Sequence, residues 1–302
     1  MKEKFNIKNL IPLLIAFAVL IIAVPIRVGQ YLKIIDASTG FYNEINLSVY
    51  ILYFVLGAGI VLGLVIPFIK HKALKPVTLS TKSIGFTAVS LIMAVTLIVD
   101  SASQLLDYFD LFGAVGAAPG QDINAYVASQ GGTLLLLQAV FGALSAVYFF
   151  VTGVTIGLGN SDSSKFKVIA LLPTLWCIFK LLYRFKRTIS FVNVSDLLLE
   201  LFYIVFSMMF FFALAQINSK IDINEKGSEL ISSIYWKIFG YGVPAALLAL
   251  VCFIPKLVLL ISGSSDHINS QYPIYISDLG FAVFTIYTCI TALKAKENTT
   301  EE

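Results

Sequence analysis

The chain has 302 residues, of which 58% are hydrophobic and only 13% are charged, and its formal net charge is +3. About a quarter of the residues of a soluble globular domain are charged, so this composition excludes an ordinary soluble protein. No connecting segment exceeds roughly 25 residues, which is too short for a separate extramembrane domain. We expect an integral membrane protein in contact with the lipid bilayer. Its basic residues are expected to set topology rather than to bind nucleic acid.

Eight apolar stretches are each near the length of about 20 residues that a helix needs to cross a bilayer. They cover residues 10–26, 47–69, 84–106, 133–158, 166–183, 195–217, 234–261 and 275–293. The sequence therefore predicts an all-α fold, a polytopic bundle of about eight transmembrane helices that forms one domain over residues 1–302. Lysines precede the first stretch as in a signal peptide, but no small-x-small cleavage site follows, so we expect this stretch to be retained as a helix.

The distribution of basic residues predicts that both termini are cytoplasmic, with residues 294–302 as a tail. The segments predicted to face the cytoplasm contain most of the basic residues, namely Lys2, Lys4, Lys8, Lys70, Lys72, Lys75, Lys82, Lys165, Lys167, Lys220, Lys226, Lys294 and Lys296. One loop disagrees, because Arg184, Lys186 and Arg187 would lie outside. Either the helix count is wrong, or the loop over 184–194 is a functional exception.

The segment 27–46 is predicted to be an outer interfacial segment. Val28, Tyr31, Leu32 and Ile35 fall on one helical face, so the segment can lie flat at the membrane surface. Residues 36–40 then predict a turn, since aspartate, serine, threonine and glycine favour turns.

Two stripes of ionisable side chains interrupt the apolar stretches. Asp100, Gln104 and Asp107 share one face of the third predicted helix, at spacing i, i+4, i+7. The same spacing recurs on the fifth, as Lys180, Arg184 and Arg187. Both helices run outward, so we expect Asp100 to lie at the depth of Lys180 and Asp107 to lie near Arg187, with the stripes pairing.

Further charges belong to the same half of the membrane. Asp196 and Glu200 form an i, i+4 acidic pair on the sixth predicted helix and are expected to compete for the same basic partners. Lys256 directly follows Pro255, and Asp278 begins the eighth helix. The seventh stretch is interrupted by glycine and proline, as in a kinked or broken helix.

Two functions are compatible with these charges. In the leading hypothesis, an outward-facing charged recess with surplus positive charge binds or transports a small polar or anionic solute. Its candidate ligand-binding residues are Lys180, Arg184, Arg187, Lys256, Asp100, Gln104, Glu200 and Asp196. In the alternative, the charge pairs are structural, and the protein is an accessory, sensory or scaffolding membrane protein.

The sequence carries no phosphate-binding loop, nucleophile elbow or zinc-protease motif, and it predicts no cofactor and no metal site. Cys177, Cys252 and Cys289 lack metal-ligand spacing, and the two histidines lie in loops predicted on opposite sides of the membrane. An intramembrane hydrolase or transferase using Asp100 and Glu200 is a further alternative.

Two strings of residues carry a resemblance to known proteins. The first is Arg27-x-x-Gln30-x5-Asp36-x-x-Thr39-Gly40-Phe41-Tyr42, and the second is Tyr183-Arg184-Phe185 followed by Ser195-Asp196 and Glu200. Together they resemble an uncharacterised family of multi-pass membrane proteins from Gram-positive anaerobic bacteria. The resemblance implies a bacterial plasma membrane, and the family has no assigned activity.

Overall fold

The computed structural model describes residues 10–69, 83–115, 122–159, 168–187, 195–218, 227–269 and 272–294. Within these residues the chain is helical and forms no strand, which confirms the all-α prediction. The helices are α1 (Ile11–Lys33), α2 (Leu47–Ile69), α3 (Ile84–Val115), α4 (Ile123–Ser129), α5 (Gly132–Gly157), α6 (Leu172–Arg187), α7 (Ser195–Asn218), α8 (Gly227–Ile261) and α9 (Ile276–Lys294).

Six of the helices, α1, α2, α3, α5, α7 and α8, are long and apolar enough to cross a membrane. Their lipid-facing surfaces carry large exposed apolar side chains such as Phe17, Phe54 and Phe150, as expected for helices in hydrocarbon. The chain is a multi-pass membrane protein. Helix α6 is shorter and more charged, and the apolar part of α9, Ile276–Thr291, is also shorter than these six helices.

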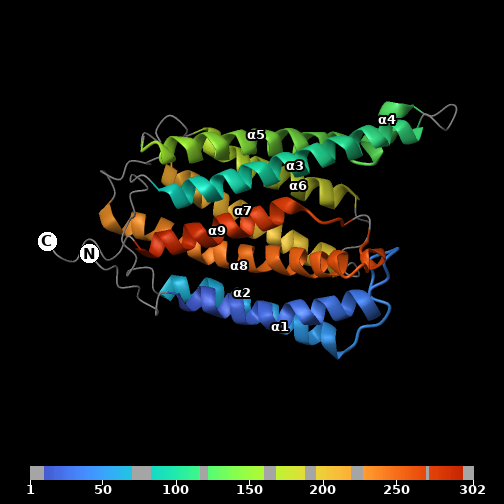
Figure 1. Ribbon diagram of the computed structural model, residues 1–302, viewed down its shortest axis with the longest axis horizontal. Coiled ribbons are helices and arrows are strands. Elements are labelled where there is room, and N and C mark those ends of the chain that lie inside the picture. Colours follow the sequence, from blue (N-terminus) through green and yellow to red (C-terminus); the bar gives the residue numbers. More distant parts are fainter. Residues whose placement is uncertain are drawn as a thin grey trace.

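The long helices lie side by side in three groups (Figure 1). The hairpin of α1 and α2 packs on α8 along one side of the bundle, and α3 pairs with α5 along the other. Helices α6, α7, α8 and α9 lie between them, and successive long helices run in opposite directions. Helix α1 begins, and α9 ends, at the same end of the bundle.

Small residues allow the helices to approach closely. On α5, Gly153 packs against Ser90 and Gly157 against Thr87 of α3, and the Thr87 hydroxyl donates to the carbonyl of Gly153 over 2.9 Å. On α2, Gly59 packs against Val19 and Leu247. These glycines serve packing, as expected where helix association depends on close van der Waals contact.

The end of α1 differs from the prediction. Instead of ending at residue 26, α1 continues to Lys33, so the first part of segment 27–46 is not a separate interfacial helix. The reason is that Tyr31 and Ile35 face inward, where they pack on Leu259 of α8. Burial of these side chains extends the helix past the expected boundary at residue 26, whereas the position of the segment at the membrane surface stays a prediction.

The predicted turn over residues 36–40 is present. The Asp36 carboxylate accepts hydrogen bonds from the backbone N–H and hydroxyl of Ser38 and from the hydroxyl of Thr39. These bonds, that from the Ser38 N–H foremost, lower the pKa of Asp36. Because the folded-state pKa is lowered, the contribution of Asp36 to the turn is present at neutral pH and is lost as the pH falls through that pKa.

The close packing of α3 against α9 can be tested by substitution of Gly280. A Cβ atom at Gly280 would lie 2.1 Å from Oγ1 and 3.0 Å from Cβ of Thr96, so Gly280→Ala should force α9 away from α3. We expect the variant to lose about 1–3 kcal/mol of stability, measured by thermal unfolding in detergent. Gly57→Ala is the matched control, since nothing lies within 4 Å of a Cβ at Gly57. Equal melting temperatures of the two variants would contradict the packing described.

Candidate functional site

Eight charged side chains are buried within the described part of the chain, and four cations balance four carboxylates. They are Arg27, Lys180, Arg184 and Lys256, with Asp100, Asp196, Glu200 and Asp278. Each residue exposes 6% of its surface or less. An unpartnered charge inside a membrane costs about 2.5–3.5 kcal/mol on insertion scales, so these side chains must be neutralised by one another or by water.

The first group, here called the α1 cluster, comprises Arg27, Tyr31, Asp196 and Lys256. Arg27 Nη2 lies 2.5 Å from Asp196 Oδ1, and the Tyr31 hydroxyl donates to the same oxygen. Lys256 Nζ lies 3.7 Å from Asp196 Oδ2 and donates to the carbonyl of Tyr272 over 2.9 Å. A single carboxylate on α7 therefore holds side chains from α1 and α8.

The second group, here called the α6 cluster, comprises Lys180, Arg184, Glu200 and Asp278. Arg184 donates to Glu200 Oε1 from both Nε (3.0 Å) and Nη2 (2.9 Å). Lys180 Nζ lies 3.2 Å from Asp278 Oδ1 and 3.9 Å from Glu200 Oε1. These contacts join α6, α7 and α9, and two cations face two carboxylates.

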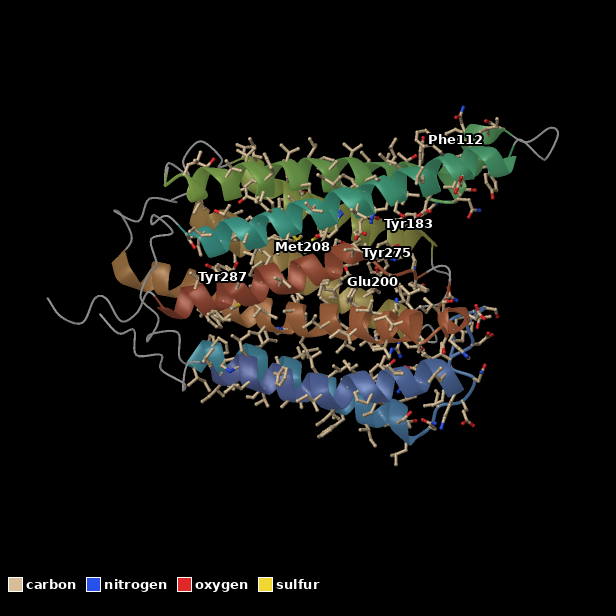
Figure 2. All side chains as sticks on the ribbon, in the orientation of Figure 1. Phe112, Tyr183, Glu200, Met208, Tyr275 and Tyr287 are labelled. Carbon is tan, nitrogen blue, oxygen red and sulfur yellow. The ribbon has the colours of Figure 1, made fainter. Side chains whose placement is uncertain are left out.

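Aromatic rings enclose the cations of the α6 cluster. Lys180 Nζ lies 5.4, 5.1 and 4.8 Å from the ring centroids of Trp176, Tyr203 and Tyr275. Arg184 donates to the Tyr275 hydroxyl over 2.9 Å and lies over the ring of Tyr272. Figure 2 shows Tyr183, Tyr275 and Glu200 close together in this region. Ring faces attract cations, which adds to the stabilisation from the carboxylates.

Asp100 holds the beginning of α9. Its Oδ1 and Oδ2 accept the backbone N–H groups of Ile276 (3.1 Å) and Ser277 (2.7 Å). Figure 1 shows that α9 begins well inside the bundle. The first N–H groups of a helix lack partners within the helix, so a carboxylate from α3 satisfies donors that would otherwise be buried unpaired.

Two buried amides lie at a similar level along the contact between α3 and α5. Ser101 approaches Gly142, so the antiparallel register places Gln104 at the level of Gln138. Both side chains are buried, and the Oε1 atom of each lacks a hydrogen-bond partner among the described residues. A buried acceptor without a partner costs about 1–3 kcal/mol, so this is the part of the site best suited to water or to a polar solute.

A layer of packed aromatic rings separates the polar region from the end of the bundle at which α9 ends. The Phe281 ring packs on the rings of Tyr203, Phe210 and Phe211, and Phe284 packs on Phe149. Phe281 and Phe284 are fully buried. The polar region therefore ends at a dense apolar layer one turn beyond Asp278.

The charges pair differently from the prediction in three respects. Asp100 caps α9, whereas Lys180 pairs with Asp278 and Glu200, so the expected Asp100–Lys180 pair was wrong. Asp196 pairs with Arg27 and Lys256 rather than with the basic stripe, because Arg27 extends from α1 into the bundle.

The third difference is the charge balance, since the buried cations and carboxylates of the described residues are equal in number. The predicted surplus of positive charge included Arg187, so it stays a prediction. Glu200 does bind the basic stripe, as predicted. Asp107 is exposed, and its predicted approach to Arg187 lies outside the described residues, which exclude the Arg187 side chain.

Arg27 and Tyr31 were missed as members of the site because the first helix was expected to end at residue 26. The spacing of the apolar residues along the first helix could have revealed Arg27. The buried positions Ala16, Val19 and Ala23 recur every three or four residues, and continuing that spacing places Arg27 on the same inward face. The aromatic rings around Lys180 and Arg184 left no such signal, since they converge from different helices.

No protein-family model, no curated protein and no solved structure matches the chain.

Because Asp100 caps α9, its replacement should destabilise the protein more than replacement of another aspartate of α3. Asp100→Ala should leave the N–H groups of Ile276 and Ser277 without an acceptor and lower the free energy of unfolding by about 1–3 kcal/mol. Hydrogen exchange should accelerate in the first turn of α9. The matched control, Asp110→Ala, removes an exposed carboxylate from the same helix and should have little effect. Similar effects of the two changes would rule out the cap.

Proposed function

We propose that the protein is an accessory or scaffolding membrane protein whose buried charge pairs are structural. The observation that carries this proposal is that every buried cation among the described residues lies against a protein carboxylate, Asp196, Glu200 or Asp278. The fourth buried carboxylate, Asp100, accepts the first N–H groups of α9. A site for an anion needs positive charge in excess of that taken by protein carboxylates. In the α6 cluster, Glu200 and Asp278 already neutralise Arg184 and Lys180.

We propose further that the chain crosses the membrane eight times, with α6 and α9 as the two additional crossings. Both lie along the bundle between the apolar helices (Figure 1). Four basic residues lower the hydropathy of α6. Two of them, Lys180 and Arg184, face the interior and not lipid, and the other two, Lys186 and Arg187, lie in its last turn. A charge that is buried and paired does not carry the cost of one exposed to hydrocarbon.

The proposed topology places the beginning of α1 and the end of α9 in the cytoplasm, where the lysine-rich segments of the sequence then also lie. The resemblance described above supports a bacterial plasma membrane. The clusters then belong to the outer half of the bilayer.

Cysteine labelling tests this topology. Ser265→Cys lies beyond the end of α8, and Leu158→Cys lies beyond the end of α5, at the opposite end of the bundle. A membrane-impermeant maleimide added to intact cells should label Ser265→Cys, whereas Leu158→Cys should be labelled only after the membrane is opened. The reverse pattern would invert the topology, and labelling of both in intact cells would contradict the helix count.

A specific observation favours a second candidate function, binding or translocation of a small polar solute. Helix α9 begins inside the bundle, and discontinuous helices of this kind often line transporter sites. The Gln104 and Gln138 amides offer unpartnered acceptors there. Because the buried charges balance, a neutral or zwitterionic solute suits this site better than the anion expected from the sequence.

A ligand screen separates the two functions. The wild type and Arg184→Gln would be compared by thermal shift in detergent against anions, amino acids, nucleotides and lipid head groups. Lys186→Gln is the matched control, because Lys186 is exposed on the same helix. The scaffold predicts that no member of the panel stabilises the protein, and that Arg184→Gln alone is markedly less stable.

The opposite result would establish the second function. A ligand at 100 times its dissociation constant adds about 2.7 kcal/mol to the stability of the protein that binds it. Stabilisation of the wild type and of Lys186→Gln, but not of Arg184→Gln, would overturn the scaffold and identify the class of solute.

A further inference from the structure

An apolar groove runs along the bundle between α1 and α9, with α8 as its floor, and is called here the α8 groove. Its volume is about 550 Å³, and all fifteen lining residues are Leu, Ile, Val, Ala or Phe. On the α1 wall, Leu14, Phe17 and Ile21 expose 53%, 62% and 60% of their surface, so the groove opens sideways toward the bilayer. Its floor is deeper, since Val243 and Leu247 of α8 are buried.

The shape of the groove is elongated. Its α1 wall extends from Leu10 to Val24, which corresponds to a rise of about 21 Å at 1.5 Å per residue. Half of a hydrocarbon core of about 30 Å is about 15 Å. The groove therefore follows the direction of the helices for at least the depth of one leaflet, starting from the end of the bundle where α1 begins.

The side chains that line the groove indicate whether a lipid chain or another helix fits there. Where helices of this bundle meet closely, glycine lies at the contact, as at Gly59, Gly153 and Gly280. Helices in a membrane need such small residues, because lipid is as apolar as leucine and only close packing favours their association. The α8 groove contains no glycine, serine or threonine, and its two alanines, Ala16 and Ala246, are buried. The exposed part of its lining consists of larger side chains such as Leu14 and Phe17. An uneven surface of this kind suits a flexible hydrocarbon chain.

We propose that the α8 groove binds one acyl chain of a membrane phospholipid, which remains bound when the protein is extracted from the bilayer. The lipid inserts from the leaflet at the end where α1 begins, and the chain lies lengthwise against the floor of α8. This site is separate from the charged clusters, and the proposal does not depend on whether those clusters are structural or bind a solute.

Native mass spectrometry of the protein in mild detergent tests the proposal. We expect a stoichiometric phospholipid adduct on the wild type and its loss in Leu20→Trp, whose larger ring fills the groove. Leu62→Trp on α2 is the matched control, because Leu62 is 42% exposed and lies outside the groove. An adduct retained equally by both variants would overturn the proposal, as would its absence from the wild type or a protein dimer that Leu20→Trp dissociates.

A second measurement uses only the wild type and so does not depend on the folding of a variant. The protein would be reconstituted with phosphatidylglycerol that carries a photoactivatable diazirine in its acyl chain. Crosslinks should concentrate on residues 243–254 of α8, although much of this segment is buried. Crosslinks confined to the exposed faces of α2 and α3 would contradict a bound chain.

Discussion

The arrangement of the bundle depends on two carboxylates one turn apart on α7. Asp196 binds Arg27 of α1 and Lys256 of α8, whereas Glu200 binds Lys180 and Arg184 of α6. The apolar surfaces of the helices do not by themselves select their neighbours, because in hydrocarbon one aliphatic surface is much like another. The ion pairs are directional, and they specify which side of each helix faces α7.

The beginning of α9 depends on the same region. Asp278 in its first turn pairs with Lys180, and Asp100 of α3 accepts its first N–H groups. The α3–α5 pair is thereby joined to the centre through α9, as the α1–α2 hairpin is joined through Arg27. Breaking one partner of a buried pair leaves an uncompensated charge, so each group of helices is held by interactions that are costly to remove singly.

Much of the fold could be predicted from the sequence. The apolar stretch at 47–69 coincides with α2, and those at 195–217 and 275–293 differ from α7 and α9 by about a residue at each end. The charged residues at the centre were also identified, with the exception of Arg27. Their pairing could not be predicted, because the spacing of Asp100 and Lys180 along their own helices does not say how far apart those helices lie. The irregular segment before α9 places the first N–H groups of that helix beside Asp100. Helical periodicity cannot predict such a contact, because it describes only which residues of one helix share a face.

A double-mutant cycle on Lys180 and Asp278 tests whether the buried ion pairs hold the bundle together. Thermal unfolding in detergent would be measured for Lys180→Met, Asp278→Leu and the double variant. Lys180→Met leaves Asp278 buried without a cation, and Asp278→Leu leaves Lys180 with only the longer contact to Glu200, which Arg184 already shares. Each single change should cost about 3–5 kcal/mol, and the double variant should recover much of that loss. If the two losses instead simply add, Lys180 and Asp278 do not stabilise each other, and a structural role for this ion pair is contradicted.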